Sequence, residues 1–91
     1  MLNPMTYYRP TRTSDSERGF TEALGDGSLV YGAMEYHETE LTATVRRNGP
    51  LQVGDILEAD GEYYTVMGFV TSPRAGYRRA MLEKRDRPTH E

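Results

Sequence analysis

The stretch QVGDILEADGEYYTVMGFV, residues 52–70, is typical of a β-hairpin closed on Asp60 and Gly61. A type I′ turn needs positive φ at both of its central residues, and an Asp-Gly pair between two extended runs meets that need. With these two residues in the turn, Leu57 faces Tyr64 on the opposite strand. The register of the whole hairpin follows from this turn.

The hairpin has two predicted faces, because side chains alternate between the faces of a strand. The first face is a core row made of Leu57, Tyr64, Val66 and Val70. The second face collects Ile56, Glu58, Tyr63, Thr65, Met67 and Phe69. The second face is too apolar to be wholly solvated, so we expect the hairpin to lie inside a small barrel or against a partner.

The composition indicates a single small domain, residues 1–91, with a thin core. Leu, Ile, Val and Phe contribute only 15 residues, to which seven Tyr and five Met are added. This is a low share for a globular core, so we expect stabilisation by neighbouring subunits. The chain has no cysteine for a disulfide or a thiolate site. Without a long apolar run or a signal-peptide core, we expect a soluble protein that contacts no membrane.

The formal charge of −3 is unevenly distributed along the chain. The middle is acidic, with Glu35, Glu38, Glu40, Asp55, Glu58, Asp60 and Glu62. The last fifth is basic, with Arg74, Arg78, Arg79, Lys84, Arg85 and Arg87. One interpretation is ordinary solvated strand faces. The other is a dipolar subunit whose acidic side meets the basic side of the next subunit in a ring.

Turn signals at regular spacing predict five to seven short strands and no helix. Outside the hairpin, the expected strands are 5–13, 20–24, 28–36, 38–47 and 77–84, with turns at 14–19, 25–27 and 72–76 and loose tails at 1–4 and 86–91. The expected inward residues are Leu41, Ala43, Val45, Ala80 and Leu82, with Thr42, Thr44 and Arg46 outward. Pro10 belongs at a strand end, an edge or a bulge, and Gly32 indicates a bulge or a close backbone approach. The pattern predicts an all-β fold, a small antiparallel β-barrel with protruding loops or, alternatively, a sandwich.

The residues do not suggest an enzyme or a cofactor site. His37 has Glu35, Glu38 and Glu40 nearby, but one imidazole with one carboxylate on the same strand face falls short of the ligands a metal needs. The other histidine, His90, lies in the tail. The chain has no phosphate-binding glycine motif and no nucleophile elbow. We therefore expect no catalysis, no cofactor and no metal.

Two short segments combine arginine with tyrosine, as surfaces that bind nucleic acid do. They are Tyr77-Arg78-Arg79 and the run from Tyr7 to Arg12. The overall acidity opposes attraction to phosphate. A nucleic-acid-binding module resembling an OB or SH3 barrel is therefore an alternative prediction, and an accessory domain of an enzyme is another.

The order of these motifs resembles the head–tail joining proteins of tailed bacteriophages, also called head-closure or stopper proteins. The resemblance covers about residues 6–85 and is most specific in the hairpin. The residues that carry it are Arg9, Thr21-Glu22, Val30-Tyr31-Gly32-Ala33, Thr42–Arg46, Gly54-Asp55, Leu57, Gly61, Tyr64, Val66, Arg78-Arg79 and Leu82. Two departures are Leu24, where many relatives have tryptophan, and the short segment 37–40 between two strands, where relatives often have a longer loop.

The resemblance implies a non-enzymatic virion structural protein, made in the host cytoplasm and located in the neck of the particle. Its relatives form a homo-oligomeric ring, commonly of twelve copies, between the portal-bound adaptor and the tail or tail-terminator ring. They retain packaged DNA and let the double strand pass without reading its sequence.

The site prediction that follows has two parts, neither of them catalytic. Ring or partner contacts are expected at Tyr7, Tyr8, Arg9 and Tyr31, with Gly25, Asp26 and Gly27 as a loop protruding toward a neighbouring ring. A loop facing the lumen of the ring is expected at Glu35, His37, Glu38 and Glu40.

Overall fold

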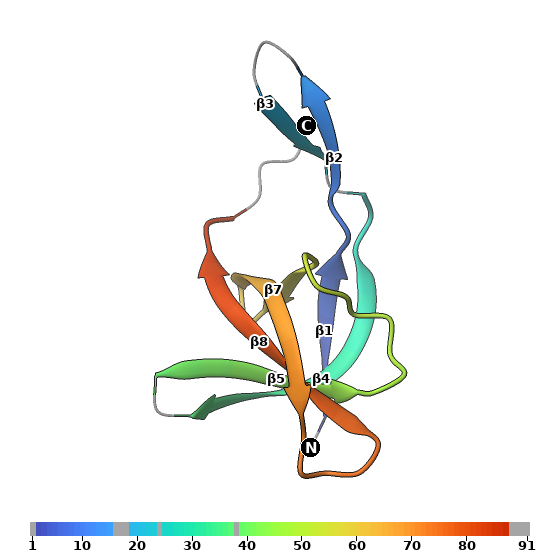
Figure 1. Ribbon diagram of the computed structural model, residues 1–91, viewed down its shortest axis with the longest axis vertical. Helices are drawn as coiled ribbons and strands as arrows, with labels where there is room; N and C mark the ends of the chain where they lie inside the picture. The colour runs from blue at the N-terminus through green and yellow to red at the C-terminus, as the bar shows by residue number, and fades with distance from the viewer. Residues whose placement is uncertain (1, 16–18, 24, 38, 88–91) are drawn as a thin grey trace.

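A computed structural model of the chain shows an all-β molecule built around a closed antiparallel barrel (Figure 1). It describes residues 2–15, 19–23, 25–37 and 39–87. The barrel order is β1-β4-β5-β8-β7-β6, with β6 pairing back to β1. The strands are β1 (Asn3–Tyr8), β2 (Thr11–Asp15), β3 (Gly19–Ala23), β4 (Ser28–His37), β5 (Glu40–Arg46), β6 (Ile56–Ala59), β7 (Glu62–Thr71) and β8 (Tyr77–Arg85). The predicted small antiparallel barrel is confirmed.

Strands β2 and β3 form a separate two-stranded sheet. This hairpin projects from one end of the barrel and accounts for the long axis of the molecule, which measures 46 Å against 25 and 23 Å for the others (Figure 1). The prediction of a turn over 14–19 was therefore too wide, because Ser14 and Asp15 continue β2 and Gly19 begins β3. Pro10 lies between β1 and β2, where its missing N–H breaks no ladder.

The hairpin between β6 and β7 closes as predicted. Asp60 and Gly61 both have positive φ, at 52° and 78°, which is the backbone of a type I′ turn. Leu57 pairs with Tyr64 across it. Beyond the ladder, the Val66 N–H donates to the Asp55 carbonyl oxygen at 2.9 Å. The predicted register is confirmed over its whole length.

The predicted core row fails at one position, Val70, which is 44 % exposed. The pairing of β7 with β8 shifts between Val66 and Gly68, so one extra residue is inserted in β7. A bulge of this kind reverses which residues face inward beyond it. Phe69 consequently packs against the core, although the alternation predicted it on the other face.

The core lies inside the barrel and includes the predicted inward residues of β5 and β8. Its buried members are Met5, Val30, Ala43, Val45, Leu51, Leu57, Tyr64, Val66 and Ala80. Leu41 and Leu82 are partly buried against it, also as predicted. Thr42 and Thr44, predicted to face outward, are nevertheless buried. The outward side of the barrel wall is thus partly covered by the chain itself.

Gly32 marks a close backbone approach inside the barrel, as predicted. A Cβ added there would lie 2.6 Å from Met5 Cε and 2.9 Å from the Thr44 carbonyl oxygen. Separations this short do not occur for real Cβ atoms, so β4 can take this position against β1 and β5 only with glycine. Side-chain size at one residue therefore limits how tightly the barrel closes.

One of the two predicted loose tails is partly structured. The prediction of a loose tail at 1–4 was wrong for Asn3 and Pro4, because both residues belong to β1 and pair with β4. At Pro4, β1 pairs with β4 alone among the described strands, so the proline lies at a sheet edge, where it is tolerated. In the predicted tail at 86–91, Asp86 and Arg87 follow β8 without strand structure, and 88–91 lie outside the described residues.

Gly25, Asp26 and Gly27, predicted to form a loop protruding toward a neighbouring ring, are all exposed, and the contact with a neighbouring ring stays a prediction. These residues connect β3 to β4 at the base of the projecting hairpin. A Cβ at Gly27 would clash with Thr6 Cγ2 and would lie 2.9 Å from Tyr8 Cε1. Glycine therefore allows the connection to run close along β1 rather than away from the barrel.

Candidate interaction surfaces

Arg9 joins β1 to the long β5–β6 connection. Its guanidinium donates to both carboxylate oxygens of Asp55, at 3.2 and 3.1 Å, and to the Pro50 carbonyl oxygen at 2.7 Å. The buried Asp55 carboxylate also accepts the Gln52 N–H at 2.8 Å. The hydrogen bonds and the negative charge of Asp55 raise the pKa of Arg9 above the usual value for arginine. The structure thus gives Arg9, predicted at a ring contact, a role within the subunit.

The three tyrosines predicted at ring contacts do not form one surface. Tyr7 packs against the core. The Tyr8 hydroxyl donates to Glu58 Oε1 at 2.9 Å, and this bond, together with partial burial, raises the pKa of Tyr8 above 10.0. Tyr31 is 51 % exposed, and Leu29, two residues earlier on the same face of β4, is 56 % exposed. Of the predicted tyrosines, Tyr31 is therefore the one that presents its ring to solvent.

The end of the β4–β5 hairpin projects sideways from the barrel (Figure 1). We call its described residues Tyr36, Thr39 and Glu40 the hairpin tip. Tyr36 is 76 % exposed and Glu40 is exposed. Glu35, just before the tip, is half-buried. Glu38 and the side chain of His37 lie outside the described residues, so the lumen-facing group stays a prediction.

Beside the hairpin tip lies an open groove of about 580 Å³. Its apolar lining comes from Tyr36, Leu41, Tyr64, Met81 and Leu82, and its charged lining from Glu40, Glu62, Glu83 and Lys84. Burial raises the pKa of Tyr64. Lys84 Nζ lies 3.2 Å from Glu62 Oε2, and both side chains are more than half exposed. Three carboxylates with one ammonium group leave this end of the barrel acidic.

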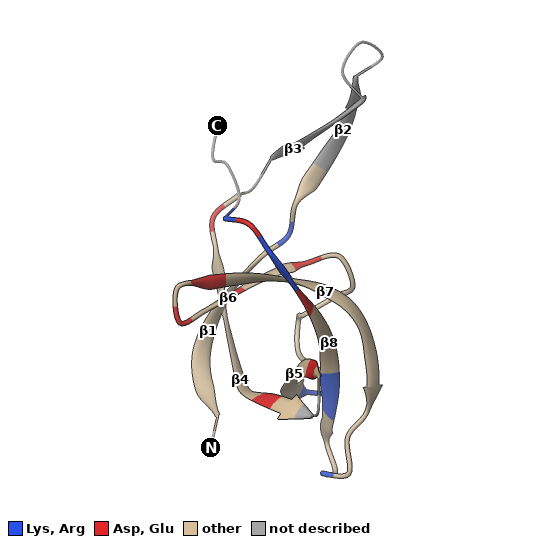
Figure 2. Cartoon of the chain, turned by 90° about the vertical axis from the view of Figure 1, so that its left-hand side faces the viewer, with Lys and Arg blue, Asp and Glu red and all other residues tan. Residues whose placement is uncertain are grey.

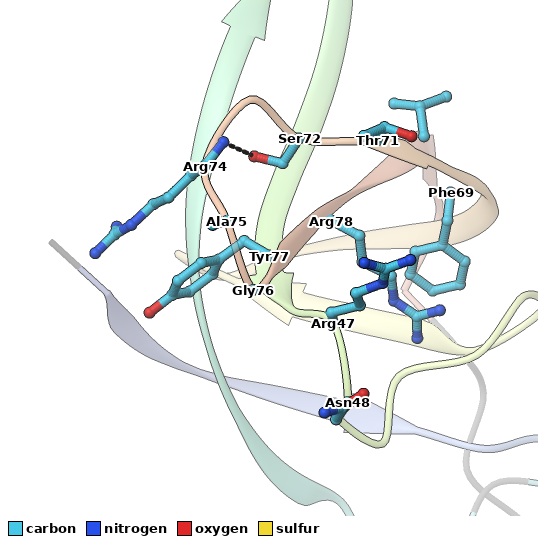
Figure 3. Close-up of a pocket in the computed structure, with 11 residues that line it drawn as sticks. Arg47, Asn48, Phe69, Thr71, Ser72, Arg74, Ala75, Gly76, Tyr77 and Arg78 are labelled. Atoms are coloured by element: carbon cyan, nitrogen blue, oxygen red, sulfur yellow. Dashed lines mark hydrogen bonds between the residues drawn. The ribbon is translucent and has the colours of Figure 1, made fainter.

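A second hollow, of about 420 Å³, lies where β5 ends and β7 turns into β8 (Figure 3). We call it the arginine hollow, after Arg47, Arg74 and Arg78, which line it with Phe69 and Tyr77. The Arg78 guanidinium lies 3.6 Å from the centre of the Phe69 ring and that of Arg74 lies 4.4 Å from the Tyr77 ring. Both distances are within the range of cation–π attraction.

Sequence reasoning found this hollow only in part. It grouped Tyr77, Arg78 and Arg79, but Arg79 does not line the hollow. It missed Arg47, which the Arg47 N–H···O=C Gly76 hydrogen bond of 2.9 Å brings to the β7–β8 turn. It also missed Phe69, because the bulge in β7 that turns it inward has no clear signal in the sequence.

Two common kinds of functional feature are missing from the residues that the structure describes. No three His, Cys, Asp or Glu side chains are grouped in this part of the chain so that they could hold a metal ion. The described residues also contain no helix long and apolar enough to cross a membrane. Comparison with protein-family models, with curated proteins and with solved structures found no match for the chain.

Proposed function

We propose that this protein is a non-enzymatic structural subunit that assembles with its own copies into a ring at the head–tail joint of a tailed bacteriophage. The observation that carries the proposal is the amount of apolar surface left over once the barrel has closed. Among the residues whose side chains the structure describes, six large hydrophobic ones are 44 % exposed or more: Leu29, Tyr31, Tyr36, Val53, Met67 and Val70. Neighbouring apolar side chains left exposed on a small subunit favour a protein interface.

The barrel accounts for part of the apolar surface that the sequence assigned to a partner. Ile56 and Tyr63, on the second face of the β6–β7 hairpin, are 1 % and 8 % exposed without any partner chain. The need for a partner therefore does not rest on this face. It rests on the outward face of β4, where Leu29 and Tyr31 stand next to each other, and on the exposed Tyr36.

The residues of the family resemblance support the proposal in a second way. Gly54 and Asp55 lie far in sequence from Arg9, yet the three form one arrangement. Gly54 has φ +92° and donates its N–H to the Val66 carbonyl oxygen at 2.8 Å, which sets Asp55 against Arg9. Three of the resembling positions thus hold the β5–β6 connection against the end of β1.

In the proposed setting the ring, of about twelve copies by the resemblance, sits between the portal-bound adaptor and the tail or tail-terminator ring. It lines the channel through which double-stranded DNA leaves the head, and it contacts no membrane. The exposed pair of Leu29 and Tyr31 belongs to a protein contact.

The test is the mass of the purified protein in solution, measured alone and with a candidate adaptor ring. Wild type is expected as a multimer, alone or on the adaptor, and Leu29→Ser with Tyr31→Ser is expected to shift it toward the monomer. Val53→Ser is the matched control, because Val53 is similarly exposed but lies outside the strands. A chain that stays monomeric at high concentration and on the adaptor would contradict the proposal.

A further inference from the structure

The arginine hollow concentrates positive charge without a described counter-charge. Among the described residues that line it there are three arginines and no Asp or Glu. Figure 3 shows Arg47 and Arg78 directing their guanidinium groups into the same part of the hollow, beside Phe69. Like charges held this close repel one another unless an anion balances them. The hollow is therefore suited to a partner that brings negative charge.

Arg78 is held in place by its own subunit. Its Nη2 donates to the Leu51 carbonyl oxygen at 2.7 Å. Its guanidinium group stacks on the ring of Phe69. Its Nε is buried and has no hydrogen-bond partner. Arg47 and Arg74 are exposed. A fixed cation at the back and two exposed cations at the rim form a preorganised site for carboxylates.

The hairpin tip has the complementary properties. It projects from the barrel (Figure 1), Glu40 is exposed, and Tyr36 offers an unburied aromatic ring. The hollow in turn has apolar surface from Val70, Tyr77 and Phe69 on which such a ring can pack.

The two surfaces lie at opposite ends of one strand. Glu40 begins β5 and Arg47 directly follows it, so an extended chain at about 3.3 Å per residue places them about 23 Å apart. A subunit therefore cannot insert its own tip into its own hollow. Two different surfaces at opposite ends of a subunit generate a head-to-tail contact, which closes into a ring when the rotation permits.

We propose that the hairpin tip of one copy docks into the arginine hollow of the next, with the Glu40 carboxylate against Arg47 and Arg74. This inference rests on the proposed ring and names the contact that builds it. A nucleic-acid backbone is a weaker match, because the chain carries net charge −3 and acidic residues gather at the β6–β7 turn of the same barrel (Figure 2). The hollow is also a single concavity rather than a stripe of basic residues.

The test uses two variants with opposite charge changes, Glu40→Arg and Arg74→Glu. Each is expected to weaken self-association about tenfold or more, because each places like charges opposite each other. An equimolar mixture of the two should recover association, since the basic tip of the Glu40→Arg variant then meets the carboxylate introduced at position 74 of the other variant. Arg87→Glu is the matched control, with the same change of charge outside the hollow. Sedimentation equilibrium gives the association constants.

The outcomes separate this inference from the proposed function. If wild type is multimeric and both variants associate like wild type, the docking contact is wrong and the ring stands. If each variant is weakened but the mixture does not recover, the two residues do not face each other and the contact is again wrong. A wild type that never associates removes both proposals. If a 30-base-pair DNA duplex binds wild type and Glu40→Arg but not Arg74→Glu, with association unchanged, the hollow is a phosphate site instead.

Discussion

At the scale of single residues, Asp55 determines how the long β5–β6 connection folds. Its side chain is 3 % exposed and accepts from Arg9 and from the Gln52 N–H. A buried carboxylate is tolerated only when donors surround it. Arg9 comes from the end of β1 and half of its side chain is in solvent. The pair therefore links the first strand to a connection 46 residues later in the chain.

We predict that Asp55→Ala lowers the free energy of unfolding by about 2 kcal/mol, because the Gln52 N–H loses its acceptor and Arg9 its anchor. Arg9→Ala is also destabilising, since it leaves the buried carboxylate without its cation. The double variant should be little less stable than the worse single variant, because both substitutions break the same arrangement. Urea denaturation followed by tyrosine fluorescence measures all three.

The control for this cycle is Lys84→Ala, which removes a salt bridge between exposed partners. It should change stability by about 0.5 kcal/mol or less. Strict additivity of Arg9→Ala and Asp55→Ala would mean that the two side chains act independently, against the geometry described above.

At the scale of strands and turns, features set by adjacent residues could be predicted from the sequence. Features that depend on pairing with residues distant in the chain could not. The Asp60–Gly61 turn was predictable, because its φ angles depend on two adjacent residues. Val70 was misplaced, because the bulge in β7 arises from its pairing with β8. The close approach of Gly27 to Tyr8 was not predicted for a similar reason, because it depends on a strand distant in the sequence.

The close approach at Gly32 leads to a prediction about strand packing. Gly32→Ala should cost about 1–3 kcal/mol, because the new Cβ would press on the backbone of Thr44 and on the side chains of Met5 and Val45. Gly68→Ala is the matched control: it also lies in a barrel strand, but no atom lies within 4 Å of its added Cβ. Thermal unfolding followed by circular dichroism compares the two, and equal melting temperatures would contradict the close approach.

At the scale of the whole molecule, the candidate surfaces are assembled from segments that the sequence keeps apart. The arginine hollow takes Arg47 from the end of β5, Phe69 from β7 and Arg74 from the following turn. Only Tyr77 and Arg78 could be grouped beforehand, because they are adjacent. The hairpin that projects from the end of the barrel was likewise hidden, since 14–19 was interpreted as a turn rather than as parts of two strands.

The last prediction concerns how much the β2–β3 hairpin contributes to the stability of the barrel. In the described backbone, β2 and β3 pair only with each other, while β1 and β4 pair directly beneath them up to Tyr7 and Ser28. Replacing residues 11–23 with a short Gly-Asn-Gly linker should therefore leave the barrel folded, with a melting temperature within about 5 °C of wild type. The shorter connection between β1 and β4 also lowers the entropy cost of loop closure. This gain offsets the contacts that are lost where the hairpin meets the barrel.

The same variant separates folding from assembly. Because Arg9, Asp55, the hairpin tip and the arginine hollow are all retained, the linker variant should keep its near-ultraviolet circular dichroism and its association with its own copies. Loss of the cooperative unfolding transition would show instead that the hairpin is part of the folding unit. Retained self-association with lost adaptor binding would show that the β2–β3 hairpin contacts a partner outside the ring.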